Sequence, residues 1–187
     1  MNIAGILLAA GRSTRFGRDK LIEPLGDTCI AAQSALNLLP HVQSLTIVIA
    51  KDNHPLANRL ENITSAIVSC AHSHQGMSAS LICGIQHTMN SDGWLIALAD
   101  MPFIQQDVYA KITSAAQQGN TIVVPRFQNQ RGHPVFISKK FRGGLLQLQG
   151  DCGARDLLRA HAHEIVSVEV SDAGILRDVD YPLDMNS

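Results

Sequence analysis

Six short apolar runs recur along the chain, and longer segments of mixed polarity separate them. The first runs show no regular alternation of polar and apolar residues, which is typical of strands that are covered by helices on both faces. We therefore predict strands that are buried on both faces rather than strands with one solvent-exposed face. The predicted strands span residues 3–8, 45–49, 66–69, 94–98, 121–124 and 165–170.

The segments between these strands suit helices, which are predicted over residues 28–39, 78–89, 105–118, 139–148 and 153–161. Ser78 has the small polar side chain of an N-cap, and Gly119 is a residue type that commonly ends a helix. Alternating strands and helices indicate βαβ units, so we predict an α/β fold with three layers around an open, mostly parallel, Rossmann-like sheet. No repeat or linker interrupts the pattern, which indicates a single domain over residues 1–187.

Composition narrows the class of partner. The 187 residues are 45% hydrophobic and 17% charged, with a formal net charge of −1, whereas nucleic acids and anionic membranes usually require a basic excess. We therefore expect a small-molecule ligand, no nucleic acid and no membrane. The first apolar run is too short for a signal sequence or a membrane span, so we expect a cytoplasmic protein. The four cysteines form no Cys-x-x-Cys pair, and we expect reduced thiols.

Three polar segments follow predicted strands. In an open parallel sheet, ligands bind at the carboxyl ends of the strands, where the strand order reverses. The loop over residues 10–20 follows the first strand, residues 75–80 come shortly after the third, and Asp100 directly follows the fourth. These segments should meet at one edge of the sheet.

The loop after the first strand combines small residues with cations. Ala10 and Gly11 leave their backbone N–H groups open to an anion, and Arg12, Arg15 and Lys20 could neutralise a polyphosphate. The spacing alone is also compatible with an ordinary strand-to-loop junction that carries a solvated basic face.

Carboxylates are candidates for a metal site. Asp100 ends an apolar strand, and Asp178 and Asp180 are spaced by two, which places both on one face of an extended segment. Mg²⁺ prefers hard oxygen ligands and commonly takes one or two carboxylates together with substrate phosphates. Asp100 could instead cap the end of its strand, and Asp180 could be a solvated turn residue.

The amino-acid sequence of the first loop resembles that of a known protein family. The pattern Leu-Ala-Ala-Gly-x-Ser-x-Arg-Phe-Gly-x-x-Lys, here Leu8 to Lys20, resembles the signature loop of the nucleotidyltransferases that act on molybdopterin, and within them it is most similar to the molybdenum cofactor cytidylyltransferases. The resemblance implies a nucleotidyltransferase fold and a nucleotide site. The residues implied for nucleotide binding are Leu8, Ala9, Ala10, Gly11, Arg12, Arg15, Lys20, Ser78, Ser80 and Asp100, with Arg15, Lys20 and Asp100 as catalytic residues.

Other segments match the same family. Gly76-Met77-Ser78 stands where the family has Gly-Met-Gly, and Tyr181 replaces the usual threonine of the C-terminal acidic motif, in which Asp180 is the implied second metal ligand beside Asp100. Two further motifs, Arg-Gly-His-Pro-Val at residues 131–135 and Gly-Asp-x-Gly-Ala-Arg at residues 150–155, resemble the acceptor side. The implied acceptor-binding residues are Arg131, His133, Asp151 and Arg155.

The resemblance implies transfer of the nucleotidyl group of CTP to molybdopterin with Mg²⁺ as cofactor, and it leaves room for a recipient molybdoenzyme as a protein partner. Guanylyl transfer and transfer to another phosphorylated acceptor, such as a sugar phosphate, are alternatives, and so is a delivery protein without chemistry. A dinucleotide-dependent oxidoreductase is disfavoured, because the loop offers only Gly11 and Gly17 in place of Gly-x-Gly-x-x-Gly.

Overall fold

The computed structural model describes residues 1–11, 19–64 and 66–180. Its strands are β1 (Ile3–Ala9), β2 (Pro24–Leu25), β3 (Thr28–Cys29), β4 (Ser44–Ala50), β5 (Ile67–Cys70), β6 (Gly93–Leu98), β7 (Ile122–Phe127), β8 (Gln130–Arg131), β9 (Val135–Ser138) and β10 (Ile165–Glu169). The α-helices are α1 (Ile30–Leu38), α2 (His54–Leu60), α3 (Met77–His87), α4 (Gln106–Gln117), α5 (Arg142–Leu145) and α6 (Arg155–Ala160). Short 3-10 turns include η1 (Lys20–Ile22), η3 (Ser73–Gln75) and η6 (Ala173–Leu176).

The central sheet has the order β10-β7-β9-β6-β1-β4-β5. All neighbours on this path pair in parallel except β9, which lies antiparallel between β6 and β7. The chain runs from β1 outward to β4 and β5 and then crosses to β6 on the other side of β1. The strand order therefore reverses at β1 and β6, which is where a doubly wound sheet binds its ligand. The predicted open, mostly parallel sheet is confirmed.

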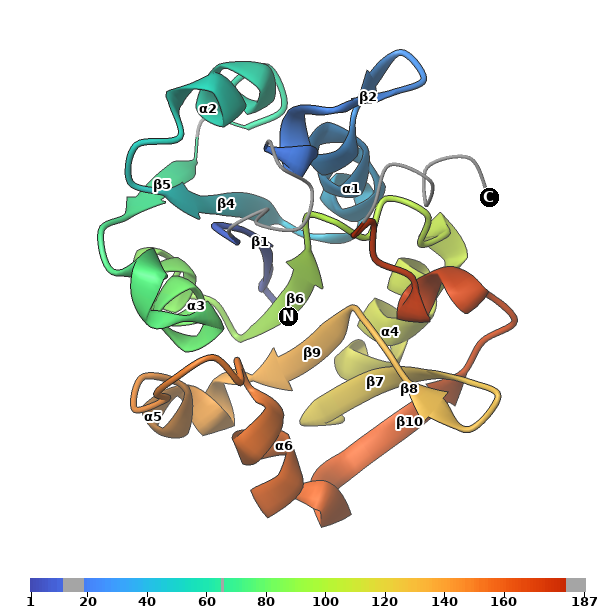
Figure 1. Cartoon of the computed structure of the whole chain (residues 1–187). Coiled ribbons are helices and arrows are strands. Elements are labelled where there is room, and N and C mark those ends of the chain that lie inside the picture. The colour runs from blue at the N-terminus through green and yellow to red at the C-terminus, as the bar shows by residue number, and fades with distance from the viewer. Residues whose placement is uncertain (12–18, 65, 181–187) are drawn as a thin grey trace.

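Side chains of β1 alternate between two buried clusters, which explains the three layers. Ile3 and Leu7 pack with α1, α2 and α4 on one face, whereas Ile6 and Leu8 pack with α3, α5 and α6 on the other. Both faces of β1 are buried, as the continuous apolar run predicts. In Figure 1, α1 and α4 lie on one side of the sheet and α3, α5 and α6 on the other.

The predicted helices need corrections at their ends. The helix predicted over residues 28–39 begins at Ile30, because Thr28 and Cys29 pair with β2. The predicted helix over residues 139–148 is a 3-10 turn followed by the four-residue helix α5, and the one over residues 153–161 starts at Arg155. Helix α2 and the antiparallel strand β9 were not predicted from the sequence.

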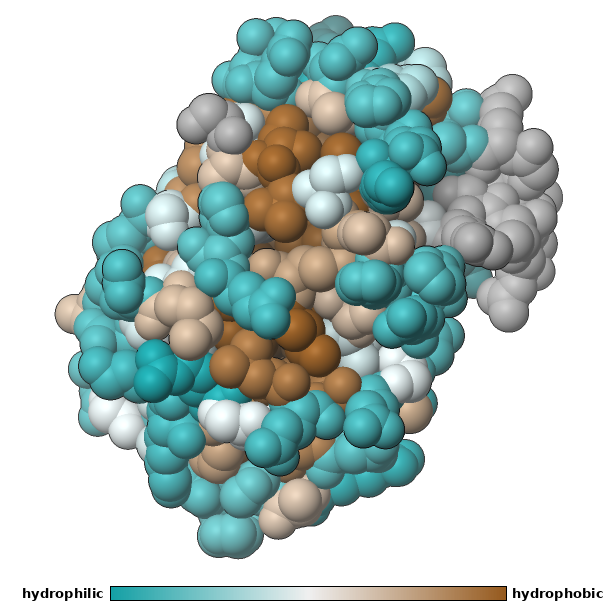
Figure 2. Space-filling view, turned by 90° about the vertical axis from the view of Figure 1, so that its left-hand side faces the viewer, coloured by the Kyte–Doolittle hydropathy of each residue, from teal (hydrophilic) through white to brown (hydrophobic). Residues whose placement is uncertain are grey.

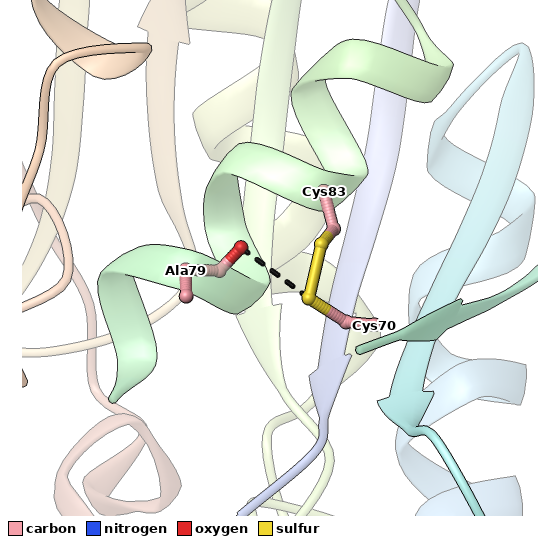
Figure 3. Close-up of a disulfide and its surroundings, with 3 residues drawn as sticks. All are labelled: Cys70, Ala79 and Cys83. Carbon is pink, nitrogen blue, oxygen red and sulfur yellow. Dashed lines mark hydrogen bonds between the residues drawn. A yellow bond between two sulfur atoms is a disulfide. The ribbon is translucent and has the colours of Figure 1, made fainter. Parts of the chain in front are cut away.

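Cys70 and Cys83 form a disulfide, which corrects the expectation of four reduced thiols (Figure 3). Cys70 ends β5 and Cys83 lies on α3, with Cα atoms 6.1 Å apart, a separation that a disulfide spans. The packing of α3 against β5 brings the two residues together. Cys29 and Cys152 are free thiols.

The surface mixes polar and apolar side chains. On the face that carries β5, α3 and α5, hydrophobic side chains gather near the middle and hydrophilic ones surround them (Figure 2). Within the described residues, no helix is long and apolar enough to cross a membrane.

Candidate functional site

A cleft of about 670 Å³ opens at the carboxyl ends of β1 and β6, and we call it the main cleft. Its wall is built from segments far apart in the sequence: the end of β1, η1, the segment from η3 into α3, the end of β6, the loop before α6 and the C-terminal segment. The lining residues are Leu8, Ala10, Gly11, Lys20, Leu21, Ser73, His74, Gln75, Gly76, Met77, Ser80, Leu98, Asp100, Asp151 and Asp180. The sheet edge that the sequence indicates is thus the edge at which the cleft lies.

Three carboxylates meet at one side of the main cleft. Asp100, Asp178 and Asp180 each place a carboxylate oxygen within 4.8 Å of the others. The backbone N–H of Val179, which is fully buried, donates to the carbonyl of Asp100 over 2.8 Å. This bond holds the C-terminal segment against the end of β6, so residues on either side of Val179 come close to Asp100. Hard oxygen donors in this number suit a divalent ion such as Mg²⁺ or Mn²⁺.

Lys20 lies among these carboxylates. Its ammonium nitrogen is 2.9 Å from Asp100 Oδ2 and 2.9 Å from Asp180 Oδ1. Burial disfavours the charged ammonium and would lower the pKa of Lys20, but the charges and hydrogen bonds of the two aspartates outweigh burial and raise the pKa above 10.5. Lys20 is therefore a permanent cation at neutral pH.

The backbone that carries Lys20 is held in place by Asp19. One carboxylate oxygen of Asp19 accepts from the N–H of Leu21 over 3.1 Å, which caps η1. The other accepts from the side-chain amide of Asn53 over 2.6 Å, which ties η1 to the start of α2. These bonds fix the direction from which the Lys20 side chain enters the main cleft.

The start of α3 forms another wall. Gly76 has φ +116°, and a Cβ at this position would lie 2.6 Å from the carbonyl oxygen of Gly150. Only glycine tolerates this conformation at this distance. The N–H of Met77 donates to Asp151 Oδ1 over 2.8 Å, so the loop before α6 supplies a carboxylate to the N-terminus of α3.

The two serines of α3 have different surroundings. Ser80 lines the main cleft. Ser78 is 1% exposed, and its hydroxyl lies 3.1 Å from the carbonyl of Gln149 and 3.4 Å from that of Gly153. Ser78 is not the N-cap predicted from the sequence, because α3 begins one residue earlier with Gly76 as its cap. In this conformation the hydroxyl of Ser78 supports the loop before α6 and does not face the main cleft.

A second cavity of about 450 Å³, which we call the side pocket, adjoins the main cleft. Leu8, Met77 and Leu98 line both cavities and form their common wall. Apolar side chains make up much of the lining of the side pocket, and three arginines and a histidine belong to it as well. Its other lining residues are Leu81, Ile96, Val124, Arg131, Gly132, His133, Val135, Cys152, Gly153, Ala154, Arg155, Leu158, Arg159 and Ile165.

His133 is a polar residue of the side pocket whose backbone and ring are both held by the fold. Its backbone N–H donates to Ile175 over 3.1 Å, and its Nδ1 atom is buried with no hydrogen-bond partner among the described residues. Burial lowers the pKa of His133 below 6.5, a backbone hydrogen bond with Ile96 and the charge of Asp100 oppose this shift, and the charge of Arg155 adds to it. The imidazole is therefore neutral at pH 7, and its buried Nδ1 could exchange a hydrogen bond with a ligand.

The C-terminal segment connects the two cavities. Asp172 accepts from the N–H groups of Gln105 and Gly174, each over 2.8 Å, which fixes the start of η6 beside α4. A few residues further on, Ile175 receives the N–H of His133, and Val179 donates to Asp100. One short segment thus positions a residue of the side pocket and the carboxylates of the main cleft.

The structure groups most of the predicted site residues. Leu8, Ala10, Gly11, Lys20, Ser80, Asp100 and Asp180 line the main cleft, and Arg131, His133 and Arg155 line the side pocket. Ala9 lies in the core beside the cleft at 1% exposure. Asp151, expected on the acceptor side, lines the main cleft. Arg12 and Arg15 lie outside the described residues, so the roles predicted for them stay predictions.

Residues outside the predicted segments also line the cavities. Ser73 and His74, which directly precede the predicted segment 75–80, line the main cleft, and Arg159 lies one turn after Arg155 in the side pocket. The position of residues 73 and 74 shortly after β5, at the ligand edge of the sheet, was the available signal for the first two. Arg159 follows Arg155 by four residues, a spacing that places both on one face of a helix.

The open α/β sheet, the carboxylate after β6, the two carboxylates of the C-terminal segment and the lysine between them agree with a nucleotidyltransferase. The family follows from the sequence: residues 5–165 match the model of the MobA-like NTP transferase domain, and the chain belongs to this family. The resemblance noted in the sequence is thereby confirmed.

Three curated relatives are similar over nearly the whole chain. The purine catabolism protein PucB of Bacillus subtilis is 28% identical, with 96% of this chain and 92% of that protein covered. The molybdenum cofactor cytidylyltransferase of Escherichia coli is 27% identical, with 96% and 91% covered. A molybdenum cofactor guanylyltransferase of Cupriavidus pinatubonensis is 25% identical, with 95% and 92% covered.

Solved structures share the fold. The Mycobacterium sp. strain JC1 homologue of Rv0371c superposes with a TM-score of 0.82 at 28% identity, covering 98% of this chain and 93% of that one. Rv0371c of Mycobacterium tuberculosis, in a complex with manganese, superposes with a TM-score of 0.76 at 23% identity, covering 98% and 92%.

Proposed function

We propose that this protein joins CTP to the terminal phosphate of molybdopterin and releases pyrophosphate. The observation that carries the proposal is the pair of adjoining cavities with a common wall. The main cleft has the carboxylates and the lysine that suit a triphosphate with its metal ion, and the side pocket has the apolar and basic lining residues that suit a flat heterocycle with a phosphate.

The acceptor needs no general base. The second pKa of a phosphate monoester is near ~6, so the attacking oxygen is already anionic at neutral pH. This oxygen forms a bond to the α-phosphorus of CTP, the bond from that phosphorus to the bridging oxygen breaks, and pyrophosphate leaves with the electron pair. No proton has to be moved, which agrees with a site whose buried histidine is neutral.

Asp100 and Asp180, with Asp178 beside them, would hold a divalent ion, for which we propose Mg²⁺. When bound, this ion supplies positive charge against the charge that develops on the phosphates. Lys20 stabilises the leaving pyrophosphate from the protein side, and Arg12 and Arg15 are proposed to assist it. Binding and charge stabilisation account for such a reaction without covalent catalysis.

Arg131, His133 and Arg155 are proposed to bind the acceptor in the side pocket. Among the described residues neither arginine has an ion-pair partner, so both guanidinium groups can bind a phosphate. Asp151 lies in the main cleft and caps α3. We therefore propose that Asp151 supports the nucleotide side of the site.

Ala10 bears on which base the main cleft accepts. Ala10 lines the main cleft at 7% exposure, and its methyl group takes space that a purine would need. The similarity to guanylyltransferases makes GTP the natural competitor of CTP, and another phosphorylated acceptor remains the second alternative.

The test is incubation of the protein with molybdopterin, Mg²⁺ and each nucleoside triphosphate separately, followed by identification of the dinucleotide and measurement of pyrophosphate. We expect molybdopterin cytosine dinucleotide to form in the reaction with CTP and no dinucleotide to form with the other nucleoside triphosphates. Product with GTP instead would change the base assignment, and absence of product with every nucleotide would reject molybdopterin as the acceptor.

A further inference from the structure

The ammonium group of Lys20 occupies the place where a metal ion would contact two of the three carboxylates. Its nitrogen is 2.9 Å from an oxygen of Asp100 and 2.9 Å from an oxygen of Asp180. The Lys20 side chain is 12% exposed, less than either aspartate at 25% and 32%. The nucleotide-free protein therefore already neutralises its metal ligands with a cation of its own.

A divalent ion and this ammonium cannot share the two carboxylates. An ion bound to Asp100 and Asp180 would lie within a few ångströms of the lysine nitrogen, and like charges at such a distance repel strongly in a partly buried site. Lys20 holds Oδ2 of Asp100 and Oδ1 of Asp180, and an ion that binds either oxygen would have to compete with the ammonium. Metal binding at these two residues thus requires Lys20 to leave them.

Only the side chain of Lys20 has to move. Its backbone is held by Asp19, which caps η1 and binds Asn53 on the neighbouring turn. Two small residues, Ala10 and Gly11, line the main cleft together with Lys20 and leave room for an anion. A triphosphate that enters there is negatively charged, and it offers the ammonium of Lys20 a new partner in place of the carboxylates.

We propose that Lys20 is an internal substitute for the metal ion, and that it leaves Asp100 and Asp180 only when a nucleotide triphosphate arrives. The protein then binds the divalent ion together with the nucleotide and has low affinity for the free ion. This inference rests on the proposed function only in taking the incoming anion to be a nucleotide triphosphate.

The test measures Mn²⁺ binding without nucleotide, from the free Mn²⁺ signal in electron paramagnetic resonance. Lys20→Met keeps an unbranched side chain that is one atom shorter and removes its charge, and we expect it to bind Mn²⁺ at least about tenfold more tightly than the wild type. Lys111→Met is the matched control, because Lys111 pairs with Asp107 on the surface over 2.9 Å, and its Mn²⁺ affinity should equal that of the wild type.

The double variant Lys20→Met, Asp180→Asn should lose the gain in affinity. Persistence of the gain would place the bound Mn²⁺ elsewhere and overturn the proposal, as would equal affinity of Lys20→Met and the wild type. Lys20→Gln serves if the methionine variant does not fold, as judged by its melting curve. The Mn²⁺ measurement contains neither CTP nor molybdopterin, so a failed transfer assay would not contradict the proposed role of Lys20. Equal Mn²⁺ affinities, in turn, would not contradict the proposed transfer reaction.

Discussion

The main cleft and the side pocket share a wall but hold their charges in different ways. In the main cleft, Lys20 is already paired with Asp100 and Asp180. In the side pocket, Arg131 and Arg155 have no ion-pair partner among the described residues, and Nδ1 of His133 has no hydrogen-bond partner there. A ligand of the main cleft must therefore replace existing ion pairs, whereas a ligand of the side pocket supplies partners that the protein lacks.

This difference separates the expected effects of substitutions. Removing a charge from the main cleft leaves its former partners without compensation and changes the group that acts on the phosphates, so the rate of the chemical step should fall. Removing a basic group from the side pocket should weaken binding of one ligand and leave the rest of the site as it was.

The largest effect is expected for Asp100→Asn. Asp100 contacts Lys20 and belongs to the carboxylate trio, so we expect kcat to fall by about 10³ or more, since loss of a single electrostatic donor costs about 10²–10³. Asp180→Asn should cost less, because Asp180 does not follow a central strand. Pyrophosphate release measures the rate, and an unchanged melting curve is the control. Near-normal release by Asp100→Asn would exclude the metal role.

Lys20→Ala should lower kcat by about 10², because the cation stabilises charge on the departing pyrophosphate. Saturating CTP should not restore the rate. The measurement is kcat and KM for CTP over a wide concentration range. Full recovery at high CTP would mean that Lys20 contributes equally to the ground state and the transition state. Substitutions in both cavities would then weaken substrate binding without slowing the chemical step.

Ala10→Gly tests how the main cleft selects its base. The change removes a methyl group from the wall, and a methyl group in a pocket is worth about 1–3 kcal/mol in selectivity. We expect the ratio of kcat/KM for CTP to that for GTP to fall by about tenfold to a hundredfold, without a complete switch. Competition between the two nucleotides in one reaction gives the ratio directly. An unchanged ratio would move base recognition to other residues of the cleft, such as Ser80.

His133→Ala and Arg155→Ala should have the smallest effects and should act on the acceptor alone. Each removes one polar contact, which corresponds to a rise of about tenfold in the KM for molybdopterin, while the affinity for CTP stays nearly the same. Calorimetry with CTP and initial rates at varied molybdopterin separate these quantities. Loss of CTP affinity in either variant would assign the side pocket to the nucleotide, and the two cavities would then not bind separate substrates.

Local patterns of sequence predicted the parts of this protein that depend on nearest neighbours. The apolar runs of β1, β4 and β6 indicate buried parallel strands, and the position of Asp100 after β6 indicates the edge where ligands bind. Strand β9 was missed because it has only four residues and follows a polar turn. Its place between β6 and β7 depends on pairing with two strands distant in the sequence.

The candidate site shows the same limit at the level of side chains. Ser78 has the residue type of a cap, but its hydroxyl bonds to a loop about 70 positions later in the chain. Asp151 resembles an acceptor ligand in its motif, yet its carboxylate caps a helix that begins 74 residues earlier. Residue type predicts which bonds a side chain can make, and the neighbours that the fold supplies decide which of them it makes.

The sequence by itself determined the α/β order of the elements, the edge of the sheet that carries the chemistry and the kinds of groups found there, because hydrophobic period, turn residues and charge are local properties. Only the tertiary structure decided that Lys20 lies between Asp100 and Asp180, residues 80 and 160 positions away. It also decided that two cavities share Leu8, Met77 and Leu98 as a wall. Such contacts form when helices pack on both faces of the sheet, and the free energy of that packing is distributed over the whole core rather than encoded in any one motif.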